Sequence, residues 1–277
     1  MQYLSFEVTG SHAAASLTLY LLDNYLEVDP RRRRPIVVIC PGGAYRFVSE
    51  RESEAVAVQM NAMGCHAAIL RYSCAPEHYP ESLLQLARSV SLVRSRAQEW
   101  FVDPDQIYVL GFSAGGHLAA SLGVFWNHED LSNALELEGS TIRPNRLILC
   151  YPVITSGSFT HMESMENITG SKREHPSSLW DFLSLERRVT ADTPPTFLWH
   201  TVDDPNVPVE NSLLFASALR RHNVPFELHV YQKGGHGLSL GTKEIECKAT
   251  HYPNQPNIRS WIRLLRTWLE QDEYACS

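Results

Sequence analysis

The sequence predicts an α/β fold with a mostly parallel central sheet and helices on both faces. Its strand-like segments are short, continuous apolar runs, which is the pattern of strands buried on both sides. Such runs occupy residues 36–39, 67–70, 107–110, 147–149 and 197–199. Segments with helical periodicity separate them, and this alternation implies right-handed βαβ crossovers.

The chain around these buried runs shows further periodicities. Two alternating runs, residues 5–9 and 16–22, predict a β-hairpin or meander before the parallel part. Residues 155–193 are rich in Ser, His, Glu and Met, with too few apolar side chains for a core of their own. We therefore expect a single domain over residues 1–277, with a small polar, cap-like excursion in place of a large lid. Helical spacing is clearest over residues 56–63, 83–100, 213–219 and 258–269.

Composition and charge exclude several classes of protein. With 44% hydrophobic and 20% charged residues, this is an ordinary globular chain. Its 24 basic and 31 acidic side chains give a formal net charge of −7, which disfavours nucleic acid as a partner. We interpret the four arginines at 31–34 as a solvated loop. The sequence has no apolar run of ~18 residues and no signal-peptide pattern at its start, so we expect a cytoplasmic protein without a membrane partner.

A candidate nucleophile stands in the motif Gly-Phe-Ser-Ala-Gly at residues 111–115, which matches G-x-S-x-G around Ser113. The motif directly follows the apolar run 107–110 and precedes a helical stretch at 116–122. A sharp strand-to-helix turn at the serine lifts its hydroxyl above the sheet, and glycines on either side let that turn close. The alternative is a glycine-rich turn that holds an incidental serine.

Attack by a serine on a carbonyl group gives a tetrahedral intermediate with a negatively charged oxygen, the oxyanion, which needs N–H donors. Two segments offer such donors. The residue after the nucleophile, Ala114, supplies one backbone N–H. The glycine-rich segment 40–45, Cys-Pro-Gly-Gly-Ala-Tyr, follows the apolar run 36–39 and lets backbone approach a ligand closely. Its alternative interpretation is a plain turn at the end of a strand.

The general base is expected at His236, between glycines in a loop after the strand-like segment 226–231. Four other histidines follow Ser113 in strand-like, helical or unremarkable sequence: His200, His222, His229 and His251. The orienting acid should lie between nucleophile and base, after the strand-like segment 196–200. Both Asp203 and Asp204 fit, and the local sequence does not choose between them.

Taken together, these motifs resemble those of α/β-hydrolases of the esterase/lipase superfamily, and more narrowly of bacterial acetyl esterases and xylan-esterase-like members. The matching stretches are residues 39–45, 48–52, 70–73, 111–118 and 200–208. The last stretch usually reads H-G-x-x-D-x-x-V-P in the family, which implies that Asp204 is the acid. The resemblance further implies that Ser113 is the nucleophile and His236 the base. It implies oxyanion donors from Gly43, Ala44 and Ala114.

Further residues near these motifs lead to expectations about the structure of the site. Thr201 replaces the usual glycine and should stiffen the acid loop. Gln85 stands where relatives often carry Asp, so one supporting contact should be missing. Tyr45 and the excursion should form walls of the substrate pocket.

We therefore expect a serine carboxylesterase that cleaves short acyl esters, above all acetyl esters, on sugars or oligosaccharides. Its partner would be a small-molecule ester. We expect no cofactor and no metal, because the sequence has no His-Glu-x-x-His motif and no clustered Cys and His. Alternatives are an exopeptidase-type serine hydrolase and a non-catalytic ligand-binding protein on a hydrolase scaffold. The oligomeric state is left open, a homo-oligomer included.

Overall fold

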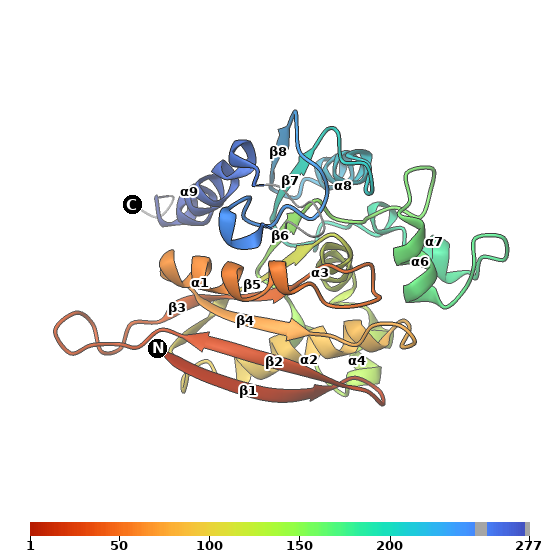
Figure 1. Cartoon of the computed structure of the whole chain (residues 1–277). Helices are drawn as coiled ribbons and strands as arrows, with labels where there is room; N and C mark the ends of the chain where they lie inside the picture. The colour runs from red at the N-terminus through yellow and green to blue at the C-terminus, as the bar shows by residue number, and fades with distance from the viewer. Residues whose placement is uncertain (247–253, 275–277) are drawn as a thin grey trace.

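The computed structural model describes residues 1–246 and 254–274, and its strands within these ranges form one eight-stranded sheet (Figure 1). The strand order is β1-β2-β4-β3-β5-β6-β7-β8. The pairs β1–β2 and β2–β4 are antiparallel and the other pairs are parallel. The predicted mostly parallel sheet is therefore confirmed. The strands are β1 (Gln2–Thr9), β2 (Ala14–Leu21), β3 (Arg34–Cys40), β4 (His66–Arg71), β5 (Val102–Phe112), β6 (Arg146–Cys150), β7 (Thr196–Thr201) and β8 (Phe226–Tyr231).

Burial explains why the apolar runs become strands. Every residue of β6 and β7 is buried, because helices cover both faces of the sheet there. The edge strand β1 instead alternates between exposed and more buried positions. Strand β5 starts five residues before its apolar run, since Val102 pairs with Arg34 across a register shift. The polar stretch Asp103-Pro104-Asp105 hides this early start from any hydrophobic pattern.

The helices lie on both faces of the sheet, as predicted. Helices α1 (Glu54–Ala62) and α9 (Ser260–Tyr274) pack on one face through Val56, Met60 and Trp261. The other face is covered by α2 (Glu81–Ser95), α3 (Ala114–Phe125) and α8 (Glu210–Arg221). Two short helices that periodicity did not predict, α4 (Glu129–Leu135) and α5 (Gly139–Ile142), join this second layer.

Two helix boundaries differ from the predicted ones. Helix α2 ends at Ser95 rather than near residue 100, because the chain must turn into β5. Phe101 takes a φ of +55° in that turn, which no continuing α-helix allows. Helix α9 starts at Ser260, because Pro256 opens a short 3-10 turn that includes Ile258.

Residues 155–193 contain α6 (Met162–Thr169) and α7 (Leu179–Phe182). Figure 1 shows both helices at the end of the sheet toward which the parallel strands run. This is the edge where the loops after β3, β5, β7 and β8 also lie, so the excursion can reach a site built from those loops. Within the ranges that the structure describes, no helix is both long enough and apolar enough to cross a bilayer.

Candidate active site

Ser113 occupies a strained turn between β5 and α3. Its φ is +53°, a value that side chains other than glycine rarely adopt, and its side chain is almost fully buried. The turn needs the flanking glycines: a Cβ at Gly111 would lie 2.1 Å from the carbonyl oxygen of Gly115. A Cβ at Gly115 would lie 2.0 Å from the carbonyl oxygen of Cys40. Close approach of the backbone thus explains the G-x-S-x-G spacing.

The structure brings Ser113, His236 and Asp204 together from three loops. Ser113 Oγ lies 2.7 Å from His236 Nε2, and His236 Nδ1 lies 2.7 Å from Asp204 Oδ2. Neither His200 nor His229 is hydrogen-bonded to Ser113. His200 bonds Ser212 and the Val207 carbonyl and lies 3.5 Å from Asp204 Oδ2, and His229 bonds Glu227. His222 is exposed at the end of α8, and His251 lies outside the described residues.

The geometry distinguishes the two candidate acids. Asp204 accepts the N–H groups of Asn206 and Val207 on Oδ1, at 2.9 and 3.0 Å, and holds His236 with Oδ2. Burial by itself would raise the pKa of Asp204, but hydrogen bonds from His200 and His236 and the charge of His236 bring this pKa well below its usual range. Asp204 is therefore a carboxylate at neutral pH.

Asp203 has a different task. Its Oδ1 accepts the Gly234 N–H at 2.7 Å, and its Oδ2 forms an ion pair with Lys233 at 3.3 Å. Thr201 supports the same junction by donating its hydroxyl to the Gly234 carbonyl at 2.7 Å. Asp203 and Thr201 thus tie the end of β7 to the loop that carries His236.

The glycine-rich segment 40–45 presents free backbone donors to the cavity of Ser113. Gly43 has a φ of +130°, and a Cβ there would lie 1.9 Å from the Phe47 carbonyl oxygen. Gly43 and Ala44 line the same cavity as Ser113. Among the described residues, no hydrogen bond occupies the N–H groups of Gly43, Ala44 or Ala114. Backbone N–H groups that have no acceptor and lie beside a nucleophilic serine can stabilise the negative charge of an oxyanion.

A buried glutamate links this segment to the loop of His236. Glu52 is 2% exposed, and its carboxylate accepts the Gly42 N–H at 2.7 Å and the Tyr151 hydroxyl at 2.6 Å. The Tyr151 oxygen accepts the Ser239 N–H at 2.8 Å, and its ring lies edge-on to His236 with centroids 5.1 Å apart. Sequence reasoning assigned Glu52 and Tyr151 no role. The one feature of the sequence that could have indicated a role for Glu52 is its place at the end of the stretch 48–52, which resembles the family.

The cavity around Ser113 has a volume of about 180 Å³. The excursion contributes His161 and Glu163 to its wall, and Glu163 forms an ion pair with Arg46 at 3.1 Å on the rim. The expectation that Tyr45 lines this pocket is wrong. The Tyr45 ring is 2% exposed, because its hydroxyl turns inward to bond His117 Nδ1 at 2.9 Å.

Gln85, where a supporting contact was expected to be missing, forms hydrogen bonds of its own. The Gln85 carbonyl oxygen accepts the Ser73 N–H at 2.8 Å, and its amide nitrogen donates to Ser73 Oγ and to the Ala13 carbonyl. An uncharged amide thus supports the segment after β4, because it offers both an acceptor and donors.

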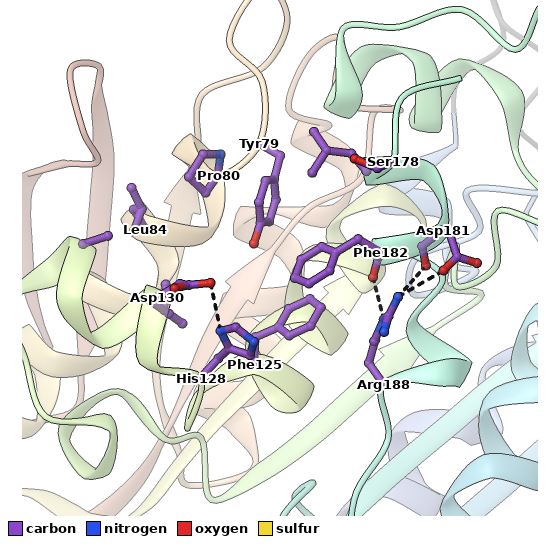
Figure 2. Close-up of a pocket in the computed structure, with 13 residues that line it drawn as sticks. Tyr79, Pro80, Leu84, Phe125, His128, Asp130, Ser178, Asp181, Phe182 and Arg188 are labelled. Carbon is purple, nitrogen blue, oxygen red and sulfur yellow. Dashed lines mark hydrogen bonds and ion pairs between the residues drawn. The ribbon is translucent and has the colours of Figure 1, made fainter. Parts of the chain in front are cut away.

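A second, larger cavity of about 500 Å³ lies between α2, α4 and α7 (Figure 2). Figure 2 shows Tyr79, Phe125 and Phe182 at its centre, with Ser178 and His128 on opposite sides. No serine or cysteine among the described residues is hydrogen-bonded to a histidine there, so the smaller cavity is the candidate active site. The described residues also contain no cluster of three or more His, Cys, Asp or Glu placed to hold a metal ion.

His117, one turn after Ser113, makes the stability of the fold depend on pH. Burial lowers the pKa of His117 to about 4, and the neutral ring accepts from Tyr45 and donates to the Leu183 carbonyl. An unfolded chain protonates this ring near pH 6.5. Because the folded-state pKa is the lower one, the stability it contributes is present at neutral pH and is lost as pH falls from about 6.5 to 4.

We therefore expect both proteins to lose free energy of unfolding between pH 7 and pH 4.5. The loss should be about 2 kcal/mol smaller in His117→Gln than in the wild type, because the variant lacks this imidazole. Urea unfolding of both proteins at the two pH values measures this difference. Equal losses in the two proteins would show that His117 is not the responsible group.

The chain is similar to several known proteins. The model of the BD-FAE family matches residues 22–219. Endo-1,4-beta-xylanase B of Butyrivibrio fibrisolvens is 36% identical over 226 residues, which are 80% of this chain and 35% of that protein. The chain spans between 35% and 57% of the length of these and other curated relatives that it matches.

Two solved structures resemble the chain over nearly its whole length. The acetyl ester-xyloside bifunctional hydrolase from Caldicellulosiruptor lactoaceticus has a TM-score of 0.79 and 37% identity, and the match covers 95% of this chain and 89% of that one. The carboxylesterase Cest-2923 from Lactobacillus plantarum WCFS1 has a TM-score of 0.86 and 29% identity, with 99% and 98% covered. These similarities confirm the fold that the resemblance implied.

Proposed function

Because the chain belongs to the BD-FAE family of the α/β-hydrolase superfamily, we propose that it is a serine carboxylesterase that hydrolyses short-chain acyl esters of sugars or oligosaccharides. The observation that carries the proposal is the line of two 2.7 Å contacts from Ser113 through His236 to Asp204. A nucleophile, a base and an orienting acid in this order are the machinery of acyl transfer.

In the proposed reaction, His236 Nε2 takes the proton of Ser113 Oγ while that oxygen attacks the ester carbonyl carbon. The N–H groups of Gly43, Ala44 and Ala114 stabilise the negative charge that develops on the carbonyl oxygen. His236 then protonates the leaving alcohol, and an acyl-enzyme remains on Ser113. Water, activated by His236, releases the acid and restores the serine. Asp204 holds the proton on Nδ1 throughout, which keeps Nε2 free to accept one.

The size and charge of the cavity support a small, uncharged substrate. A volume of about 180 Å³ suits a short acyl group better than a long chain. The charges of Arg46 and Glu163 at the rim compensate each other. The similarity to an acetyl ester-xyloside bifunctional hydrolase favours an acetyl group on a sugar.

The proposal predicts a preference for short acyl esters. We expect p-nitrophenyl acetate to be the best substrate of a series from acetate to octanoate, with kcat/KM at least about tenfold lower for octanoate, because the cavity must be overpacked to admit it.

An aminoacyl p-nitroanilide should not be cleaved, and EDTA should leave the rate of ester hydrolysis unchanged. Acetate release from acetylated xylo- and manno-oligosaccharides then identifies the alcohol. Turnover of the anilide alone would instead support the exopeptidase, and binding without turnover the non-catalytic alternative.

A further inference from the structure

His161 is a second histidine in the cavity of Ser113. It stands at the N-cap of α6, in the excursion, and lines the cavity together with Ser113 and His236. Its ring lies nearly parallel to that of His236, with an angle of 16° between the planes and 6.5 Å between the centroids. Neither the sequence motifs nor the proposed acyl transfer gives this imidazole a task.

The hydrogen bonds of His161 determine which of its nitrogens carries the proton. Nδ1 lies 2.8 Å from Ser164 Oγ and also accepts the backbone N–H of Ser164 at 3.4 Å. A backbone N–H can only donate, so Nδ1 carries no proton. Burial lowers the pKa of His161 and the neighbouring His236 lowers it further, and these effects outweigh the opposite effect of Glu163 and Asp204, which favours a neutral ring. The remaining proton is therefore on Nε2, which has no hydrogen-bond partner among the described residues.

The position of His161 indicates which half of the ester it meets. The carbonyl oxygen is directed to the amides of Gly43, Ala44 and Ala114. His236 delivers its proton to the leaving alcohol, so the alcohol lies on the side of His236. His161 faces that same ring from the excursion, and the charged group next to it, Glu163, is already paired with Arg46. The Nε2–H group of His161 is thus a neutral donor that can bond an uncharged oxygen of the alcohol.

We propose that His161 Nε2–H donates a hydrogen bond to an oxygen on the carbon next to the esterified one. The enzyme would then select esters of vicinal diols, of which sugars are the common case, over esters of simple alcohols. This inference rests on the proposed esterase function and adds a specificity-determining residue to it. A half-buried donor in the cavity wall stays without a protein partner when the substrate lacks the second oxygen, so it favours the substrate that has one.

The test compares two acetates that differ in one hydroxyl group, the monoacetate of trans-cyclohexanediol and cyclohexyl acetate. The ratio of their kcat/KM values, diol ester over simple ester, should be about fivefold lower in His161→Phe than in the wild type. Phenylalanine keeps a planar ring of similar size and removes the N–H. His161→Gln, which retains an N–H donor, should recover part of the ratio. A purely structural role for His161 would lower both rates together and leave the ratio unchanged.

His222→Phe serves as the matched control, because His222 is an exposed histidine at the end of α8, away from the cavity. It should keep the wild-type ratio. If His161→Phe does not fold, Ser164→Ala removes the hydroxyl that holds Nδ1 and should lower the same ratio. An unchanged ratio in the folded His161 variants, with both esters still hydrolysed, overturns this inference and leaves the esterase proposal standing. If the wild type hydrolyses neither these esters nor p-nitrophenyl acetate, both are overturned.

Discussion

Replacement of Ser113 by alanine is expected to lower kcat for p-nitrophenyl acetate by about 10⁴- to 10⁶-fold. The reason is that Ser113 Oγ is the oxygen 2.7 Å from Nε2 of the proposed base His236, and no other hydroxyl of the described residues is hydrogen-bonded to that ring. The free amides of Gly43, Ala44 and Ala114 remain in the variant. They can still polarise the ester carbonyl, so a small residual rate above that in water is expected.

The Ser113→Ala variant should keep its fold. Alanine experiences the same strain at a φ of +53° as serine does, and it introduces no larger side chain. We expect its free energy of unfolding to lie within about 1 kcal/mol of that of the wild type. Ser121→Ala is the matched control, because Ser121 is a buried serine of α3, the helix that follows Ser113, and its hydroxyl bonds the His117 carbonyl. It should retain its esterase activity, and comparable activity in the Ser113 variant would refute the nucleophile assignment.

Much of the sheet was predictable from the sequence because burial on both faces leaves little choice of side chain. Residues 36–39 and 147–149 are continuous apolar runs for that reason, and both lie inside strands. The position of Ser113 was also predictable, since the strained turn requires glycine at residues 111 and 115 for lack of space. In both cases one local physical constraint excludes most other residue types.

Other features depend on contacts between distant segments, which leave no periodic pattern. The polar start of β5 is a strand because Val102 pairs with Arg34. Local sequence could not separate Asp203 from Asp204, because their roles are set by which residue of the loop after β8 each carboxylate contacts, the Gly234 N–H or the His236 ring. His161 comes from the polar excursion, where neither strand nor glycine motif marks a functional position.

The pair Asp203 and Asp204 allows a sharp test of the orienting acid, since both carboxylates contact the same loop. Asp204→Asn is expected to lower kcat by about 10⁴-fold. Its amide oxygen can still accept the N–H groups of Asn206 and Val207, which turns the NH₂ group toward His236 Nδ1. Nδ1 must then accept a hydrogen bond, so the ring proton moves to Nε2. Nε2 faces Ser113 Oγ and, once protonated, can no longer take the serine proton.

Asp203→Asn should lower kcat by less than about tenfold, because its amide oxygen can still accept the Gly234 N–H and the ion pair that it loses is solvent-exposed. Steady-state kinetics with p-nitrophenyl acetate and thermal unfolding of both variants measure the difference. Since each substitution exchanges one carboxylate oxygen for an NH₂ group, a general cost of lost charge would affect the two variants alike. A large decrease in kcat that is confined to Asp204→Asn would therefore be due to the changed tautomer of His236. A loss in Asp203→Asn that equals or exceeds it would assign the acid to Asp203.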